Sequence, residues 1–365
     1  MVLTVNHLRR FAVARSLFPP TSLERALETF GFVQADPIRA PARAQDLTLR
    51  HRVAGYRAGD LERRYATLGV DEDVLVNYGF VTHAVYELMH PRGGAASWSV
   101  SQRKRVEAIL EFVRARGVAH PRQVDDHFAH GTVTNYWGGS SNATTHLLDL
   151  MHYRGLLRVV RREAGIRLYG AQDAVRPPAD KADRARRLDA LIDVVVRKYA
   201  PLPGRSLSSL VARLRYGVPH WRRELKPALL RARRRLSHTS IDGVEWYWPA
   251  DEAVDRDTSR DTVHFLAPFD PVVWDRRRFE LFWGWAYRFE AYTPEKKRTR
   301  GYYALPLLWR ERVIGWANVS VQNGALEANM GYVSGRPPRE PPFRHALDSE
   351  LDRLRLFLGP ASPSS

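Results

Sequence analysis

The spacing of apolar positions predicts a cluster of three helices followed by a strand pair over residues 101–170. Helical periodicity runs from Ser101 to Arg116 and stops at Gly117, a residue type that commonly follows a helix C-terminus. Two further helices are predicted at 122–128 and, after a turn with Gly138 and Gly139, at 141–153. The segment LLRVVRREAGIRLYG then alternates like two strands joined at Glu163-Ala164-Gly165. This order of elements is typical of a winged helix-turn-helix.

The same order recurs over residues 182–248. Helices are predicted at 182–199, 206–215 and 221–236, and the segment LSHTSIDGVEWYWP predicts a hairpin with Asp242-Gly243 at its turn. Residues 4–86 repeat the pattern less clearly: a capping box at Thr21-Ser22-Leu23-Glu24 opens a helix that ends at Gly31, and VLVNYGFVTHAVYEL would form the strand pair. Three tandem winged-helix units are therefore expected.

The pattern changes from about Leu266 onward. Strands are predicted in YRFEAY, GYYALPLLW, RVIGWANVSV and ALEANMGYV, with a turn at Asn323-Gly324 and a closing amphipathic helix at 343–358. The polar stretch 251–261 suits a linker. We expect an α+β protein in which winged-helix units at 1–95, 96–175 and 176–250 precede a small C-terminal antiparallel β-barrel at 251–365.

Charge adds the first indication of a partner. The 365 residues carry a net charge of +17 and no cysteine, which excludes disulfides, cysteine zinc sites and thiol nucleophiles. Segment 176–250 holds 17 Lys and Arg against 7 Asp and Glu, so +10 of the excess is concentrated there. Such a patch can bind nucleic acid, an anionic membrane or an acidic protein. No signal peptide or apolar span is evident, so an intracellular, cytoplasmic protein is expected.

Common enzyme motifs are missing from the sequence. It contains no phosphate-binding G-x-x-x-x-G-K-[ST], no G-x-G-x-x-G after a strand and no G-x-S-x-G. His127 and His130 lie close to Asp125 and Asp126 and could bind a metal, but ordinary helix and turn roles suffice for them. No metal site is therefore predicted.

One short stretch, Phe32 to Pro37, combines an amide and a carboxylate at alternate positions. It follows a capped helix and alternates in polarity, so an extended backbone would place Gln34 and Asp36 on one face, with Val33 and Ala35 turned into the core. An amide can orient a water molecule whose proton a carboxylate accepts. On spacing alone, a commoner role for Asp36 is to cap a helix beginning near Arg39 or Ala42.

The sequence resembles the winged-helix DNA glycosylases of the AlkZ and YcaQ type over nearly its whole length. The resemblance rests on GFVQADPIRAPARAQDLTLRHRV near the N-terminus and on APFDPVVWDRRRFELFWGWAYRFEAYTPEKKRTRGYYALPLLWRERVIG near the C-terminus. It implies that Gln34 and Asp36 are catalytic, as the Gln-x-Asp motif of the YcaQ-like branch. It further implies a monomeric, monofunctional glycosylase that removes alkylated bases or unhooks interstrand crosslinks in double-stranded DNA without a metal or organic cofactor.

Two departures from the family pattern are visible. Gly79-Phe80-Val81-Thr82-His83 stands where the family usually has an acidic, Trp-containing stretch, and it keeps only the His. Trp316 and Asn318 replace an Arg and an Asp. These departures leave open a second hypothesis, a winged-helix DNA-binding protein without catalysis.

Basic side chains near the motif and along the predicted recognition elements are the candidate DNA ligands. They are Arg39, Arg43, His51, Arg158, Arg161, Arg162, Arg222, Arg223, Arg231, Arg233, Arg234 and Arg235.

Overall fold

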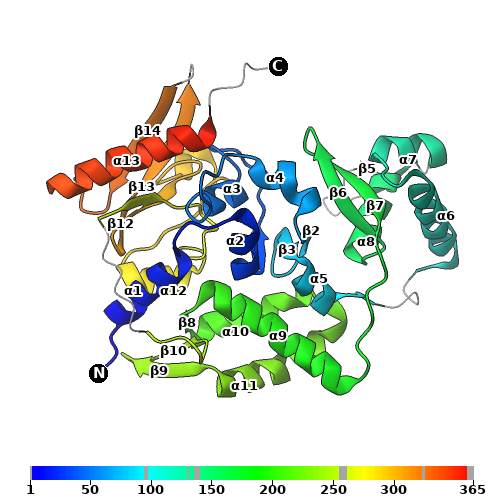
Figure 1. The fold of residues 1–365 in the computed structure, drawn as a ribbon, viewed down its shortest axis with the longest axis horizontal. Coiled ribbons are helices and arrows are strands. Elements are labelled where there is room, and N and C mark those ends of the chain that lie inside the picture. Colours follow the sequence, from blue (N-terminus) through cyan, green and yellow to red (C-terminus); the bar gives the residue numbers. More distant parts are fainter. Residues whose placement is uncertain are drawn as a thin grey trace. The chain divides into compact units, whose positions relative to one another are not determined.

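A computed structural model describes residues 2–93, 98–129, 131–134, 140–254, 261–322 and 325–359. The described chain is a mixture of helices and small antiparallel sheets and divides into two compact units (Figure 1). The first unit comprises 1–61, 192–211 and 229–365, and the second comprises 62–191 and 212–228. The expected α+β class is confirmed, whereas the division into four domains at 1–95, 96–175, 176–250 and 251–365 stays a prediction.

The first unit is built from both ends of the chain. Its elements are α1 (Val5–Ser16), α2 (Leu23–Phe30), β1 (Phe32–Gln34), α3 (Ala44–Leu49), β8 (Leu202–Pro203), β9 (Ser237–Ile241), β10 (Val244–Trp248), β11 (Val263–Phe265), α12 (Arg276–Trp283), β12 (Leu305–Trp309), β13 (Arg312–Gln322), β14 (Ala325–Tyr332) and α13 (Pro341–Leu358). α1 and α12 pack together, and Val13 joins Phe279, Tyr287 and Leu308 in one apolar core.

The second unit contains the clearest of the predicted helix clusters. Its elements are β2 (Val70–Val74), β3 (Tyr78–Thr82), α5 (His83–Met89), α6 (Val100–Arg116), α7 (Pro121–Phe128), β4 (Thr132–Thr134), β5 (Ser140–Asn142), α8 (Ala143–Tyr153), β6 (Leu157–Glu163) and β7 (Ile166–Ala171). The expected order of three helices and a strand pair is present in α6, α7, α8 and β6–β7 (Figure 1). Its arrangement as a winged helix stays a prediction.

Four further helices each contain a position at which the chain passes from one unit to the other. They are α4 (Asp60–Arg64), α9 (Lys181–Tyr199), α10 (Gly204–Arg213) and α11 (Leu225–Arg235). The last three, with the β9–β10 hairpin, give the element order expected for 182–248. The hairpin turn is at Asp242-Gly243, and both residues have positive φ angles, +50° and +73°, as this two-residue turn requires.

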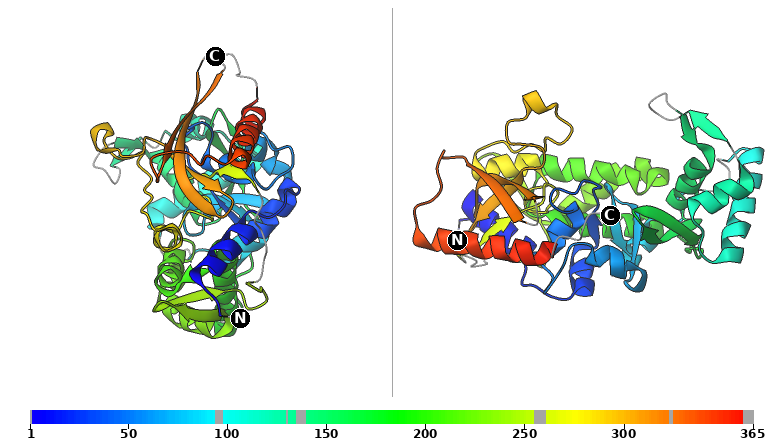
Figure 2. Two further views of the ribbon diagram at one scale, coloured as in Figure 1. Left: turned by 90° about the vertical axis from the view of Figure 1, so that its left-hand side faces the viewer. Right: turned by 90° about the horizontal axis from the view of Figure 1, so that it is seen from above.

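The C-terminal sheet differs from the expected barrel. Its four strands pair in the linear order β11-β12-β13-β14, all antiparallel, and no sheet of the described residues closes on itself. α13 runs along this sheet (Figure 2). Its Phe343 ring packs on Trp309 and Tyr332. With four strands, of which β11 and β12 are short, the sheet has too few strands to surround a core and uses the helix to cover its apolar side.

Two expected strands have other structures. YRFEAY is a loop, because Glu290 accepts backbone hydrogen bonds from Thr299, Arg300 and Gly301 and thereby holds the chain away from the sheet. The strand pair expected in VLVNYGFVTHAVYEL lies earlier in the chain, as β2 and β3, and the second half of this segment is α5. The turns expected at Gly138-Gly139 and Asn323-Gly324 lie outside the described residues, as does most of the 251–261 linker.

Candidate active site

The chain enters the candidate site through a helix that ends at a glycine. α2 begins at its cap Ser22, whose side chain accepts from the Arg25 N–H, so the cap is one residue later than the predicted capping box implies. It ends at Gly31, whose φ of +63° suits glycine and reverses the chain. β1 follows at once, and the extended backbone expected around Gln34 is confirmed for Phe32–Gln34.

Asp36 is buried, with 8% of its surface exposed, two residues beyond β1. Its Oδ1 accepts a hydrogen bond of 2.9 Å from the Ile38 N–H, and its own N–H donates to Gln45 Oε1 at 3.3 Å. The first contact is an Asx turn, in which the carboxylate stabilises its own loop. The next helix, α3, begins at Ala44 with Arg43 as its cap, so the alternative that Asp36 caps a helix is wrong.

Burial changes the chemistry of this carboxylate. Desolvation raises the pKa of Asp36 above its ordinary value, and the Ile38 hydrogen bond opposes this only in part. A carboxylate with a raised pKa is a stronger base when ionised. The side chain combines a fixed direction with increased basicity, as a group that accepts a proton from water requires.

Gln34 is oriented by a residue from a distant part of the chain. Its Oε1 accepts a hydrogen bond of 3.1 Å from Trp274 Nε1, which fixes the direction of the amide N–H₂, a donor suited to a water or substrate oxygen. The Trp274 ring in turn packs against Tyr199 with 4.6 Å between ring centroids. Of the two side chains predicted to face inward beside Gln34, Val33 is buried and Ala35 is only half-buried.

Tyr303 is a further polar group near Asp36. It is 3% exposed, and its hydroxyl has no hydrogen-bond partner within the described part of the chain. Burial is the main cause of its raised pKa, and the negative charge of Asp36 is the next. Tyr303 belongs to the C-terminal signature, but nothing in the sequence pattern relates its hydroxyl to Asp36.

Lys198, at the end of α9, supports β1 from within the protein. Its ammonium donates to the Phe32 carbonyl and lies 4.5 Å from the centre of the Phe32 ring. Burial lowers the pKa of Lys198 to about 7, although Asp270 raises it and Arg52 lowers it further. Arg52 and Asp270 are themselves joined at 2.7 Å with both side chains inaccessible. No sequence motif marks Lys198.

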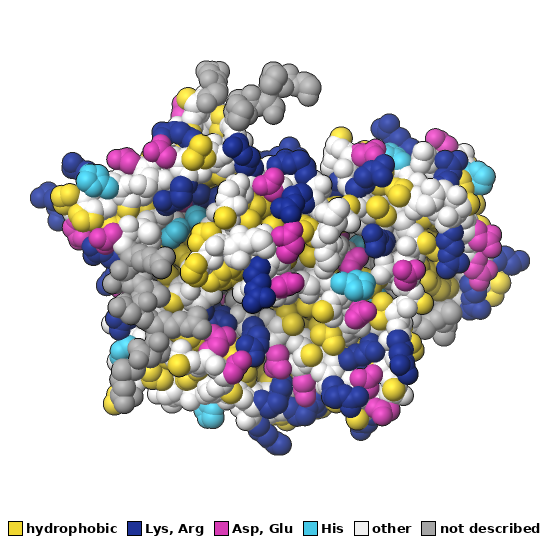
Figure 3. Space-filling model, in the orientation of Figure 1, with side chains coloured by type: hydrophobic (Ala, Val, Ile, Leu, Met, Phe, Trp, Pro, Cys, Tyr) yellow, Lys and Arg dark blue, Asp and Glu magenta, His cyan; other side chains and the backbone are white. Residues whose placement is uncertain are grey.

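The candidate DNA ligands are distributed over both units. The first unit holds Arg39, Arg43, His51, Arg231, Arg233, Arg234 and Arg235, and the second holds Arg158, Arg161, Arg162, Arg222 and Arg223. Figure 3 shows Lys and Arg interspersed with Asp and Glu over the face in view. The structure therefore places Gln34 and Asp36 in the same unit as seven of the twelve candidates.

Several of these cations have partners inside the protein. Arg162 donates to buried Glu72 at 2.6 Å, and Arg235 pairs with Asp193 at 3.1 Å. Arg233 donates to Ser208 and is half-buried, whereas Arg39 and Arg234 are exposed. His51 is buried, and its ring nitrogens are occupied by the Phe265 carbonyl and by His264.

Residues in both segments that differ from the family pattern make contacts within the protein. His83, retained at the start of α5, lies with Nδ1 3.2 Å from Asp71, so a carboxylate of β2 orients it. Asn318 donates to the Arg300 carbonyl at 2.6 Å, and the Arg300 guanidinium lies over Trp316 and Trp285. Trp316 and Asn318 thus both hold the loop that leads to Tyr303.

The described residues contain one group of three potential metal ligands, His51, His264 and Glu350, whose ligand atoms lie within 4.8 Å of one another. Arg50 and Arg353 both donate to Glu350, so its charge is already compensated and the surroundings oppose a cation. The His127 ring packs against Phe112 with 30° between the ring planes, and His130 lies outside the described residues. Among the described residues, no helix has the length and apolar character needed to cross a membrane.

Comparison with known protein families identifies a match over most of the chain. The model of a family described as "DNA glycosylase AlkZ-like" matches residues 27–357, a range that contains β1, Asp36, Trp274 and Tyr303. No solved structure matches the chain significantly.

Proposed function

The chain belongs to the AlkZ-like DNA glycosylase family, and from this premise we propose that it hydrolyses the N-glycosidic bond of cationic N7- or N3-alkylated purines, or of interstrand crosslinks, in duplex DNA. Membership supports DNA repair glycosylase activity in general. The observation that carries the finer proposal is the buried Asp36 carboxylate beside Gln34, whose amide is oriented by Trp274.

The reaction breaks the bond between the sugar C1′ and the purine nitrogen. The bonding electrons move to the purine and neutralise its positive charge, so the base leaves without needing a proton or a metal. The sugar develops oxocarbenium character, which a nearby carboxylate stabilises, as in glycoside hydrolysis. A water molecule held by the Gln34 amide then bonds to C1′, and Asp36 accepts its proton. This scheme describes a monofunctional enzyme, in which water rather than a protein amine attacks the sugar.

DNA binding is assigned to the exposed cations of both units. The exposed arginines Arg158 and Arg161 on β6, and Arg222 and Arg223 before α11, suit contacts with phosphates, since guanidinium groups bind them in a bidentate manner. We further propose that the cluster of α6, α7, α8 and the β6–β7 hairpin acts as a winged helix on the duplex, and that the protein acts as a monomer.

The test is a single-turnover excision assay on duplex DNA containing N7-methylguanine, with Asp36→Asn alongside. The variant retains an oxygen that can accept from the Ile38 N–H, so the loop should keep its conformation. The carboxylate that accepts the proton of the water is lost. We expect the excision rate to fall by about 10²- to 10⁴-fold and duplex affinity to be unchanged. The excision rate of the parent should fall on acidification, as Asp36 becomes protonated. Because the pKa of Asp36 is raised, this fall should begin at a higher pH than it would for an exposed aspartate.

Equal excision by the parent and Asp36→Asn would remove Asp36 from the mechanism. If the parent fails on N7-methylguanine, the assay is repeated on a crosslinked duplex. Failure on both substrates with tight duplex binding would replace the glycosylase proposal with a non-catalytic DNA-binding role.

A further inference from the structure

A cavity in the first unit is unrelated to Gln34 and Asp36, neither of which lines it. Its volume is about 760 Å³, and its walls come from the end of α1, the segment after α3, β11 and the end of α13. This volume is within the range of roughly 300–1,000 Å³ found for small-molecule sites. Four arginines and two histidines line it, and no carboxylate is among its lining residues; the six are Arg50, Arg57, Arg310, Arg353, His51 and His264.

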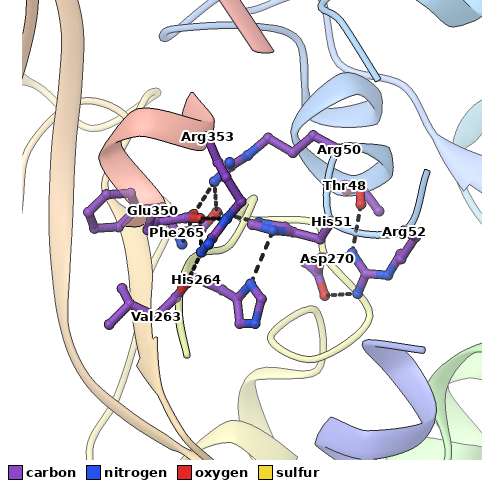
Figure 4. Close-up of polar contacts among 10 residues, drawn as sticks. All are labelled: Thr48, Arg50, His51, Arg52, Val263, His264, Phe265, Asp270, Glu350 and Arg353. Carbon is purple, nitrogen blue, oxygen red and sulfur yellow. Dashed lines mark hydrogen bonds and ion pairs between the residues drawn. The ribbon is translucent and has the colours of Figure 1, made fainter. Parts of the chain in front are cut away.

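The positive character of the wall follows from the contacts of Glu350 (Figure 4). This buried carboxylate accepts from the Arg50 guanidinium and, at 2.9 Å, from the Phe265 N–H through one oxygen. Arg353 donates to the other oxygen at 2.9 and 3.1 Å. Two guanidinium groups therefore share one carboxylate, which leaves one positive charge in excess. Arg57 adds an exposed cation, whereas Arg310 is paired with Asp261 at 2.7 Å.

The two histidines supply an acceptor to the same cavity. The Phe265 carbonyl can only accept, so the 3.0 Å contact with His51 Nε2 requires a proton on that nitrogen. Burial lowers the pKa of His51 well below its ordinary value and that of His264 to about 4, so both rings are neutral at pH 7. His51 Nδ1 then carries a lone pair, and the proton in its 3.2 Å contact with His264 Nδ1 belongs to His264. His264 Nε2 is left as a hydrogen-bond acceptor.

Aromatic side chains form part of the remaining wall. Phe18, Tyr56 and Phe357 line it, and Tyr56 and Phe357 are nearly parallel, with 16° between their rings. Leu356, which is 67% exposed, completes this side. Surfaces of this kind accommodate a planar ring, and guanidinium groups match the oxygens of a phosphate.

We propose that this cavity binds a nucleotide, with its phosphate on the arginines and its base against the aromatic wall. The His264 acceptor suits an amino group of the base or a sugar hydroxyl. The ligand is either a free mononucleotide or the terminal nucleotide of a DNA strand, which present the same chemistry. The inference does not depend on the proposed function, because the cavity shares no lining residue with the candidate active site.

The experiment is a calorimetric titration of the full chain with dGMP, beside inorganic phosphate. Arg57→Gln combined with Arg353→Gln should weaken dGMP binding at least tenfold, and Leu356→Glu, which places a carboxylate in the wall, should do the same. Arg344→Gln is the matched control, since Arg344 is an exposed arginine of α13 outside the cavity. Thermal unfolding of each variant verifies that the fold is retained.

A 5′-phosphorylated single strand is then added as competitor. Displacement of dGMP assigns the site to a strand end, and no displacement assigns it to a free nucleotide. The proposal is overturned if dGMP does not bind, if inorganic phosphate binds as tightly as dGMP, or if Arg344→Gln weakens binding as much as the cavity variants.

Discussion

At the scale of single residues, the candidate site combines positions that the sequence marks with positions that it does not. Gln34 and Asp36 are separated by one residue, so a local pattern marks them as candidates, and the family resemblance implies their catalytic role. Trp274, which orients Gln34, is 240 residues away, and Lys198, which binds the Phe32 carbonyl, is 166 residues away. Tryptophan and lysine occur in many parts of the chain, and only the fold determines which of them reach β1.

Lys198 gives a prediction about pH. Its pKa is about 7 in the fold against an ordinary value of 10.5, so between these limits the unfolded chain binds more protons than the folded one. The free energy of unfolding therefore rises with pH across this window and is lowest, as far as this group is concerned, below pH 7. Relative to Lys198→Met, the parent should gain stability from pH 7 to pH 9.

Urea unfolding of both proteins at the two pH values measures this difference. Lys226 on α11 is exposed, so Lys226→Met provides the control and should follow the parent. Equal pH dependence in the parent and in Lys198→Met would show that Lys198 has an ordinary pKa.

At the scale of elements, turns and helix ends are the features that the sequence predicts well. Ala164-Gly165 and Asp242-Gly243 form the expected hairpin turns because all four residues have the positive φ angles that short hairpins need. The sequence predicts a strand at YRFEAY because Tyr287, Phe289 and Ala291 alternate with polar residues. The conformation of this segment is instead set by Glu290, whose partners about ten residues later no local pattern contains.

The loop after Glu290 leads to a prediction about Gly301. Its φ is +119°, and a Cβ there would collide with the Asn318 side chain that holds the Arg300 carbonyl. Gly301→Ala should lower the free energy of unfolding by roughly 1–3 kcal/mol from backbone strain, with more from the collision.

Gly335→Ala is the matched control for backbone strain. Gly335 also has a positive φ, +76°, but an added Cβ would meet nothing within 4 Å. Chemical denaturation of both variants separates strain from collision, and equal decreases in stability would contradict the role given to Asn318.

At the scale of the whole molecule, the count of 57 Lys and Arg overstates the number of cations available to DNA. Arg52 and Arg278 are fully buried, and burial lowers the pKa of Arg278 to about 10. Arg15, Arg50 and Arg92 are joined to Glu252, Glu350 and Asp73. Composition alone cannot distinguish these internal cations from those that face a phosphate.

Substitutions at the basic C-terminal end of α11 test whether this part of the chain binds DNA. Replacing Arg233, Arg234 and Arg235 by Gln should weaken duplex binding. It should also flatten the dependence of log affinity on log salt by about 0.9 for each DNA phosphate that the variant no longer neutralises. Fluorescence anisotropy at several salt concentrations measures both effects.

A charge-matched control is available on the C-terminal side of the chain. Arg339, Arg344 and Arg355 are exposed, and replacing all three by Gln removes the same charge. An equal reduction of the slope in both triple variants would show that the end of α11 is no special DNA-binding site.

The discontinuity of the two units has a consequence for synthesis on the ribosome. The chain changes unit after residues 61, 191, 211 and 228, so the first 61 residues share a unit with the last segment, 229–365. Gln34 and Asp36 are therefore among the first residues to leave the exit tunnel, whereas Trp274, 240 positions after Gln34, and Tyr303 are translated much later. At roughly 5–20 residues per second, the nascent protein carries its candidate catalytic pair for many seconds before Trp274, which orients Gln34, is synthesised.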